Sequence, residues 1–361
     1  MLGMLGLFGA LLAGIIADSM IGGMMGKRDP DATDDLADDP APDAGSPDES
    51  NEPANMLDWV MVDRAADLGT GHRPDDPDYA AMSDDLAQTD DPDQVIDGGK
   101  ADDMLTGGGG DDDMAGGAGD DQMAGLDGAD LMQGGAGADS VHGGSGADTI
   151  QGGMGNDLLL GEAGNDRLVG GAGNDTLLGH DGADHLYGSA GQDTAMGGNG
   201  NDRIDGGADA DWVAGGAGKD TLTGSEGSDT LDGGLGDDVL DGRDGAGAFP
   251  EMDFLNGGDG DDFLKIGAGD YASGGDGADW FELSDMAAGD AIANIADYDA
   301  TEDTLVVVFD PAMHPAPVLS LETPENSGDV IVLLDGVPLA VVQGGAGMTL
   351  DDVLMTPAQA A

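Results

Sequence analysis

The chain has 361 residues, and its 75 acidic and 10 basic side chains give a formal net charge of −65. This charge excludes nucleic acid as a partner and electrostatic attachment to anionic lipid, and it favours cations. Cysteine is absent, so disulfides and thiolate metal sites are excluded. With 69 glycines but only 6 Phe, 4 Tyr and 3 Trp, an ordinary two-layer core is also excluded. Order must come from periodicity or from a bound ion.

Residues 1–26 form a hydrophobic segment whose single charge is Asp18, followed by Lys27 and Arg28. A helix of this length, at about 1.5 Å per residue, is long enough to cross a membrane. A signal peptide and a hydrophobic end with neither role are the alternatives, although no basic residue precedes the apolar run. The basic pair favours insertion with the C-terminal side inside, which conflicts with an extracellular location for the rest of the chain.

Residues 27–97 hold 22 acidic and 4 basic residues and eight prolines. This composition predicts a disordered, self-repelling acidic linker. One apolar island at 55–68 is either a short amphipathic helix that docks on a partner or a hydrophobic patch in a tether.

Residues 98–241 divide into sixteen consecutive nonapeptides without an insertion. Position one is always glycine, position four is glycine in fourteen repeats, and position eight is apolar throughout. A glycine-rich turn therefore alternates with a very short strand whose middle residue points inward. Position six is aspartate in every repeat: Asp103, Asp112, Asp121, Asp130, Asp139, Asp148, Asp157, Asp166, Asp175, Asp184, Asp193, Asp202, Asp211, Asp220, Asp229 and Asp238.

The repeat becomes irregular at 242–256, where about six residues are added, and two of the later repeats carry Asp262 and Asp279 at position six. The pattern ends at residue 282. Residues 283–361 are not repetitive: strands are expected at 303–310, 329–336 and 338–344, and a short helix at 348–355. A small β-rich cap that covers the last coil is the natural role for this segment.

The nonapeptide also carries its own metal chemistry. Glycines leave carbonyl oxygens uncovered in the turns, and an aspartate at a fixed place in each turn adds a charged oxygen. Hard oxygen donors of this kind suit Ca²⁺ better than zinc or copper, while Mg²⁺ demands stricter geometry. The eighteen aspartates named above are therefore the candidate ligands of multiple Ca²⁺ ions.

The pattern G-G-x-G-x-D-x-U-x, with U apolar, resembles the RTX, or haemolysin-type, calcium-binding repeat family over residues 98–282. The resemblance implies an all-β fold, a parallel β-roll (β-solenoid) with two nonapeptides per coil and one ion between stacked turns. It also implies export in an unfolded form by type I secretion machinery, with which the C-terminal sequence DDVLMTPAQAA is compatible.

Residues 98–282 contain 39 acidic and 6 basic residues, a net charge of −33, which sixteen Ca²⁺ ions would nearly cancel. We therefore expect this region to be unfolded without Ca²⁺ and to fold when Ca²⁺ binds at extracellular concentrations. The chain is expected to be secreted or extracellular, free in solution or anchored to the cell surface through residues 1–26, with a surface or matrix partner that the sequence does not identify.

Motifs of enzymes are absent from the sequence: neither H-E-x-x-H nor G-x-S-x-G occurs, and GGAGKD at 215–220 lacks the features of a phosphate-binding loop. The sequence therefore favours a non-enzymatic protein with a structural or adhesive role. The alternative is a secreted hydrolase or toxin with an unrecognised active site outside the repeats. In residues 283–361, His314 is the only histidine available for it.

Overall fold

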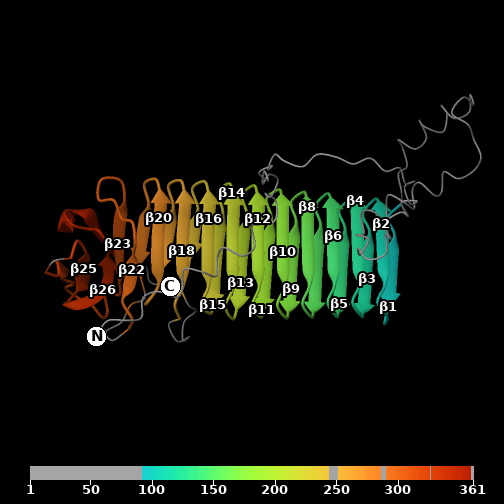
Figure 1. Ribbon diagram of the computed structural model, residues 1–361, viewed down its shortest axis with the longest axis horizontal. Coiled ribbons are helices and arrows are strands. Elements are labelled where there is room, and N and C mark those ends of the chain that lie inside the picture. Colours follow the sequence, from blue (N-terminus) through green and yellow to red (C-terminus); the bar gives the residue numbers. More distant parts are fainter. Residues whose placement is uncertain (1–91, 244–250, 285, 287–289, 326, 359–361) are drawn as a thin grey trace, which may run out of the picture. The chain divides into compact units, whose positions relative to one another are not determined.

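The computed structural model of the chain describes residues 92–243, 251–284, 286, 290–325 and 327–358. They form a parallel β-solenoid in which successive strands alternate between two sheets (Figure 1), which confirms the expected all-β parallel β-roll. Residues 1–26 and the expected linker up to residue 91 lie outside the described residues. In the described part, no helix combines the length and hydropathy that a membrane span requires.

The first sheet contains the odd-numbered strands and the second the even-numbered ones, apart from the last few strands. In spatial order the first sheet is β1 (Val95–Gly99), β3 (Asp113–Ala118), β5 (Leu131–Ala136), β7 (Thr149–Met154), β9 (Arg167–Ala172), β11 (His185–Ala190), β13 (Arg203–Ala208), β15 (Thr221–Glu226), β17 (Val239–Asp241), β19 (Phe263–Ile266), β21 (Trp280–Leu283), β23 (Thr304–Phe309) and β27 (Val353–Pro357). The second is β2 (Met104–Gly109), β4 (Gln122–Asp127), β6 (Ser140–Ser145), β8 (Leu158–Ala163), β10 (Thr176–Asp181), β12 (Thr194–Asn199), β14 (Trp212–Ala217), β16 (Thr230–Leu235), β18 (Phe254–Asp259), β20 (Tyr271–Asp276), β22 (Ala293–Ile295), β26 (Val337–Val342), β25 (Val330–Leu334) and β24 (Leu319–Glu322).

Each regular nonapeptide supplies one strand, from position seven to position three of the next repeat, and then a turn of three residues. Strand β10, for example, ends at Asp181 and is followed by a turn that ends at Asp184. Neighbouring strands are parallel and in register, so Leu177 pairs with Leu159 on one side and Ala195 on the other. Partners are therefore 18 residues apart, which means that two nonapeptides complete one coil.

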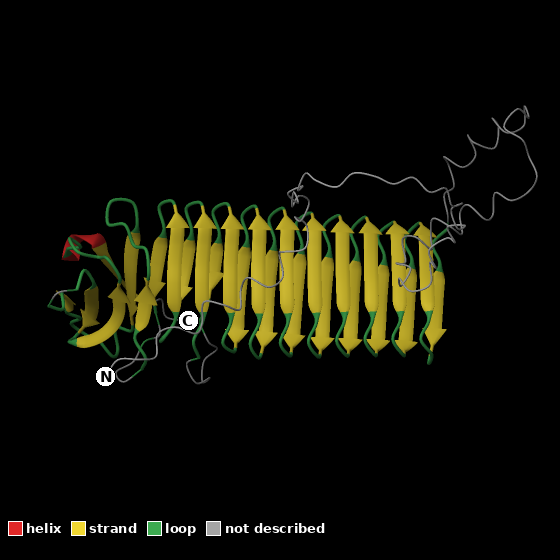
Figure 2. Ribbon diagram, viewed as in Figure 1, coloured by secondary structure: helices red, strands yellow, loops and turns green. Residues whose placement is uncertain are grey.

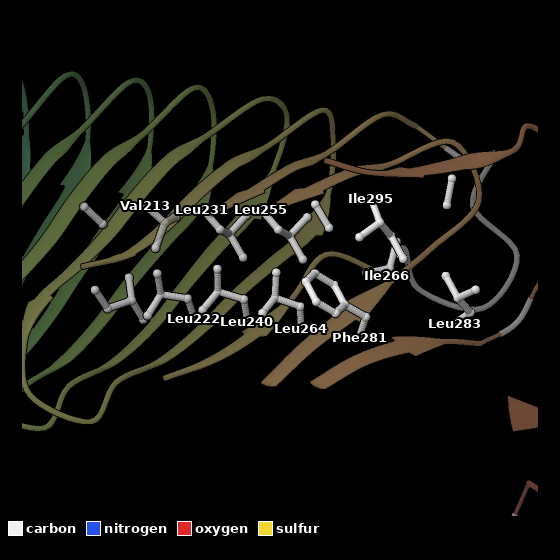
Figure 3. Packing of buried hydrophobic residues seen from close by; sticks show 14 of the residues in the cluster. Val213, Leu222, Leu231, Leu240, Leu255, Leu264, Ile266, Phe281, Leu283 and Ile295 are labelled. Atoms are coloured by element: carbon white, nitrogen blue, oxygen red, sulfur yellow. The ribbon is translucent and has the colours of Figure 1, made fainter. Parts of the chain in front are cut away.

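The core is a narrow double row of position-eight side chains. Leu222, Leu240 and Leu264 from the first sheet face the row of side chains from the second (Figure 3), and all three are fully buried. Position one also points inward but is glycine in every regular repeat, so each coil contributes only two apolar side chains to this core. Hydrophobic burial per residue is consequently small.

Parallel pairing continues beyond residue 282 through β22, β23 and β27, while β24, β25 and β26 pair antiparallel at the end of the second sheet. Strands occur in all three segments where the cap was expected to contain them. The helix expected at 348–355 is wrong: only Leu350–Asp352 form a 3-10 turn (Figure 2), and the chain then enters β27. Val353 pairs with Leu305, so the open edge of β23 outweighs the local helical preference.

Candidate metal-binding ladders

The aspartate at position six closes each turn and directly precedes the next strand. This placement puts the side chain inside the coil: from Asp112 to Asp279, the aspartates at this position are at most 4% exposed. Burying an ionised carboxylate is costly unless hydrogen bonds or an opposite charge compensate for it. The arrangement around each carboxyl therefore decides what the turns can bind.

Beyond Asp103, one oxygen of each carboxyl accepts a backbone N–H from the preceding coil. The N–H of Asp157 donates to Oδ1 of Asp175 at 2.8 Å, and the N–H of Asp175 donates to Oδ1 of Asp193 at 2.8 Å. The same bond repeats from coil to coil and generates two rows of carboxyls. The first ladder comprises Asp103, Asp121, Asp139, Asp157, Asp175, Asp193, Asp211, Asp229, Asp253 and Asp270. The second ladder comprises Asp112, Asp130, Asp148, Asp166, Asp184, Asp202, Asp220, Asp238, Asp262, Asp279 and Asp303.

The other oxygen, Oδ2, is buried and accepts no hydrogen bond from the described residues in most of these carboxyls. The residues concerned are Asp103, Asp112, Asp121, Asp130, Asp139, Asp148, Asp157, Asp166, Asp175, Asp184, Asp193, Asp202, Asp211, Asp220, Asp238 and Asp262. A buried acceptor without a donor is rare in folded proteins, and each one needs an explanation. A row of them at the period of the sequence repeat points to a bound species with positive charge.

The space in front of Oδ2 is kept open by the glycine at position one. A Cβ built on Gly170 would lie 2.4 Å from Oδ2 of Asp175 and 2.8 Å from the carbonyl oxygen of Gly188. Any side chain at Gly170 would therefore collide with both oxygens. The carboxylate oxygen and the carbonyl oxygen face the same small space. Both are hydrogen-bond acceptors, so they can lie close together there only with a proton or a cation between them.

Burial raises the pKa of nine carboxyls in the ladders, and neighbouring carboxylates of the same ladder add to the effect. The pKa of Asp166, Asp211, Asp220 and Asp262 rises to about 7, although the backbone N–H that each accepts opposes the shift. For Asp139, Asp148, Asp193, Asp202 and Asp279 the pKa rises to about 6 for the same reasons. Near neutral pH, a solenoid without cations therefore holds carboxyls that are partly deprotonated and poorly solvated.

The donor set of the ladders consists of carboxylate oxygens and backbone carbonyl oxygens. Among the described residues, no group of three or more His, Cys, Asp or Glu side chains could hold a metal ion. A cation in a ladder must therefore take much of its coordination from the backbone. Ca²⁺ accepts carbonyl and carboxylate ligands in flexible geometry, whereas Mg²⁺ needs a near-ideal octahedron and zinc prefers nitrogen and sulfur. The residues present fit Ca²⁺.

The structure places all eighteen aspartates predicted from the sequence in the two ladders, with Asp262 and Asp279 near the end of the second. Sequence reasoning missed three further members, Asp253, Asp270 and Asp303. Asp253 comes after the six-residue addition, so it accepts from Asp229 over a separation of 24 residues instead of 18. Asp270 lies in a shortened repeat. Each of these three aspartates directly precedes an aromatic or threonine residue that begins a strand, a signal that could have identified them.

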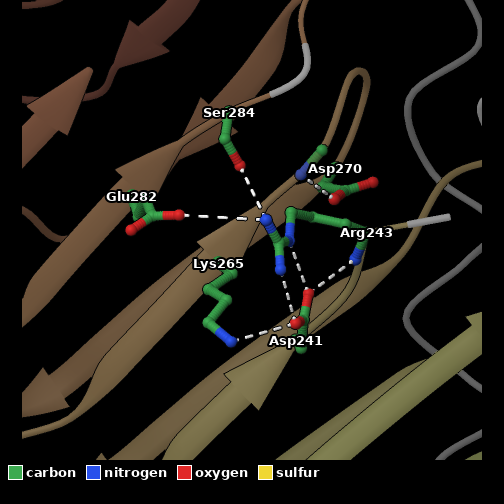
Figure 4. A network of polar contacts seen from close by, with 7 residues as sticks. Asp241, Arg243, Lys265, Asp270, Glu282 and Ser284 are labelled. Atoms are coloured by element: carbon green, nitrogen blue, oxygen red, sulfur yellow. Dashed lines mark hydrogen bonds and ion pairs between the residues drawn. The ribbon is translucent and has the colours of Figure 1, made fainter. Parts of the chain in front are cut away.

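Where the repeat is interrupted, the protein supplies its own positive charges. Arg243 donates to both carboxylate oxygens of Asp241 at 2.7 and 2.8 Å, and Nζ of Lys265 contacts Asp241 at 3.1 Å (Figure 4). Burial raises the pKa of Asp241, but the hydrogen bonds and charges of Arg243 and Lys265 outweigh it and hold the pKa below its usual value. Arg243 also contacts Ser284 and Glu282. This network outside the core ties together strands of the first sheet, and it contrasts with an inner rung such as Asp175, whose carboxyl accepts a backbone N–H.

Comparison with known proteins gives a family match and similarity to solved structures. No curated protein sequence matches the chain. The crystal structure of the extracellular lipase LipA from Serratia marcescens is similar to this chain, with 18% sequence identity and a TM-score of 0.21. The match covers 61% of this chain and 40% of the lipase chain, so this chain spans less than half the length of that protein.

The family match lies on the repeats themselves. A family model built of four copies of the RTX calcium-binding nonapeptide repeat matches residues 93–123, 124–159, 160–195, 188–222, 215–247 and 253–271. These segments contain the turns of both ladders from Asp103 to Asp270. The repeat region of this chain, from residue 93 to residue 271, therefore belongs to the RTX calcium-binding nonapeptide repeat family.

Proposed function

We propose that this chain is a secreted or surface-displayed protein whose solenoid folds when Ca²⁺ loads the two aspartate ladders, and that the folded solenoid serves a structural or adhesive purpose. The observation that carries the proposal is the shared space at position one, where a buried Oδ2 such as that of Asp175 faces the carbonyl oxygen of Gly188. Calcium binding by the repeat family supports the choice of ion.

Folding and ion binding are coupled in this proposal because the binding space does not exist in the unfolded chain. Each coil buries only two apolar side chains but confines two carboxylates, and the repeat region carries a net charge of −33. The binding energy of the ions then becomes folding energy, as it does in other small metal-dependent domains. Without ions, repulsion along each ladder and the burial of unpaired carboxylates favour the unfolded chain.

An extracellular location is expected from the same coupling. Sites built of carbonyls and single carboxylates belong to the class that loads at about 10⁻⁴–10⁻³ M Ca²⁺, a concentration found outside cells. The chain would remain unfolded inside the cell, which suits export through type I secretion machinery, and would become ordered outside it. The proposal includes residues 1–26 either as a membrane helix that anchors the chain or as a signal peptide.

The proposal assigns no enzymatic activity to the cap. A cavity in the cap has a volume of about 250 Å³ and is lined mainly by apolar side chains, with His314 at its wall. Nδ1 of His314 lies 2.7 Å from Oδ2 of Asp335. Two hydroxyl groups of this segment are engaged elsewhere: Ser284 Oγ accepts from Arg243, and Ser327 Oγ donates to Asp329. The contacts of these two hydroxyl groups give no support to a hydrolase.

The test is circular dichroism of the full chain with a chelator, with millimolar Ca²⁺ and with millimolar Mg²⁺, at one fixed ionic strength. We expect strand signal to appear cooperatively with Ca²⁺ only, and equilibrium dialysis to return many Ca²⁺ equivalents per chain. Equal strand content with chelator and with Ca²⁺ contradicts coupled folding. Binding of only one or two equivalents contradicts loading of the ladders.

A further inference from the structure

The second ladder begins at a residue that is not an aspartate. Gln94 occupies the position-six place in the first described coil, directly before β1. Its backbone N–H donates to Oδ1 of Asp112 at 2.7 Å, the same bond that joins every later pair of rungs. Gln94 is therefore part of the ladder by its backbone, and only its side chain differs.

The side chain of Gln94 brings a donor to the place where the aspartates bring an acceptor. Its Nε2 donates to the carbonyl oxygen of Gly107 at 2.6 Å. One coil later, the corresponding carbonyl oxygen, that of Gly125, faces Oδ2 of Asp112 across the space at Gly107. The side-chain amide of Gln94 thus gives the carbonyl of Gly107 a hydrogen-bond donor. The corresponding carbonyls of the inner coils must instead be partnered by a proton or a cation.

At the C-terminal end of the first ladder, a group of the protein itself again takes the place of an ion. Oδ2 of Asp270 accepts the backbone N–H of Gly267 at 2.6 Å, within the shortened repeat. Position one of this repeat is Ile266, which is fully buried, instead of glycine. A buried isoleucine therefore stands where the inner coils have a glycine, and the carboxyl is held by the backbone of its own turn.

We propose that Gln94 and Asp270 are metal-free end rungs, which stop the rows of Ca²⁺ sites at one end of each ladder. The proposal rests on the proposed function, since it takes Ca²⁺ loading of the inner rungs as given. It assigns to Gln94 the role of an internal substitute for the ion and to the Ile266–Asp270 turn the role of a closed site. Coils at these ends are then ordered by protein groups alone and protect the ladder from fraying.

The test measures Ca²⁺ bound per chain, by equilibrium dialysis of the full-length protein at saturating Ca²⁺, in wild type and four variants. Gln94→Glu keeps the shape of the side chain and replaces the donor by an acceptor, so we expect one additional Ca²⁺ per chain. Asp270→Asn is expected to leave the number unchanged. Asp211→Asn, the matched change at an inner rung of the same ladder, is expected to lower it by one or two.

Gln94→Asp, which restores the residue of the repeat, is the second variant at the N-terminal end and is expected to behave like Gln94→Glu. Circular dichroism at saturating Ca²⁺ establishes that each variant is folded. Unchanged Ca²⁺ in both Gln94 variants, or a loss in Asp270→Asn equal to that in Asp211→Asn, overturns the assignment of the end rungs while the proposed function stands. A wild-type chain that binds no Ca²⁺ overturns both.

Discussion

The backbone N–H of Asp157 donates to the carboxyl of Asp175 at 2.8 Å, across a separation of 18 residues. This bond uses one carboxylate oxygen to join neighbouring coils and leaves the other directed into the solenoid. A single residue type thus contributes to the stacking of the coils and to the binding space. Substitution at this position should therefore separate the two roles, provided that the hydrogen bond to Oδ1 is retained.

Asp175→Asn should reduce Ca²⁺ binding without breaking the ladder. The amide oxygen can still accept the N–H of Asp157, and the amide nitrogen faces the carbonyl oxygen of Gly188 as a donor, in the way that Gln94 does. We expect the loss of one or two Ca²⁺ ions and of about 1–3 kcal/mol of stability in the Ca²⁺-saturated form. Equilibrium dialysis measures the number of bound ions, and calorimetric melting at saturating Ca²⁺ measures the stability.

The control for this prediction is Asp181→Asn, on the exposed end of β10, where the carboxylate accepts from Asn199. It removes the same charge outside the ladder and should leave Ca²⁺ binding unchanged. Equal losses in the two variants would mean that overall charge, and not the position in the ladder, determines Ca²⁺ binding.

Gly170→Ala should close one binding space. The added Cβ would lie 2.4 Å from Oδ2 of Asp175 and 2.8 Å from the carbonyl oxygen of Gly188, so the carboxyl or the backbone must move. We expect a destabilisation of about 2–4 kcal/mol in saturating Ca²⁺, measured by denaturant unfolding, together with fewer bound ions. Gly328→Ala is the control because nothing lies within 4 Å of its added Cβ. A Gly170→Ala variant as stable as this control would show that the space is not confined.

The stability of the metal-free solenoid should fall as the pH rises, whereas the affinity for Ca²⁺ should increase. The pKa of Asp166 and Asp220 rises from 3.8 to about 7 in the solenoid, so protonation favours the folded state. This contribution is complete below the unfolded pKa of 3.8 and is lost as the pH rises through about 7. We expect circular dichroism with chelator to show more strand signal at about pH 5 than at about pH 8.

Protons and Ca²⁺ compete for the same oxygens, so the Ca²⁺ concentration at half-saturation should increase as the pH falls below about 7. A calcium titration monitored by circular dichroism at several pH values checks this. Half-saturation that does not change with pH would mean that the buried carboxyls are not the ligands.

Leu126→Gly should stabilise the solenoid although it removes a large side chain. Leu126 stands at position two of its repeat with φ of 87°, in the left-handed region that disfavours side chains. We expect a gain of about 0.5–1 kcal/mol in denaturant unfolding at saturating Ca²⁺. Leu131→Gly, at an exposed strand position with no positive φ, should instead lose about 1 kcal/mol. If both variants lose stability to the same extent, backbone strain at Leu126 is absent.

The repeat made the solenoid and most of the ladders predictable because every nine residues repeat one turn and one strand. Position eight identified the core and position six the candidate ligands, from Asp103 to Asp238, by spacing alone. Asp253 and Asp270 were missed because hydrogen bonds from Asp229 and Asp253 place them in the ladder, while their distances along the chain differ from 18 residues.

Other features depend on contacts that the sequence pattern does not contain. The helix expected near Val353 failed because the free edge of β23 offered a partner strand. The positive φ at position two was not expected for Leu126, Glu162 and His180, since the chain conformation there is imposed by the stacked neighbouring coils and not by the local residue. Gln94 falls within residues 27–97, where the acidic composition predicts a disordered linker, yet its backbone continues the ladder.

The interrupted repeat between Gly242 and Asp253 has a practical consequence. Although it is about six residues longer than its neighbours, Leu231 still pairs with Leu255 and Leu240 with Leu264, so the added residues shift the register of neither sheet. This place in the chain should therefore accept a foreign peptide. An epitope or enzyme tag inserted there would be carried on a scaffold that folds when Ca²⁺ is added and unfolds when Ca²⁺ is chelated.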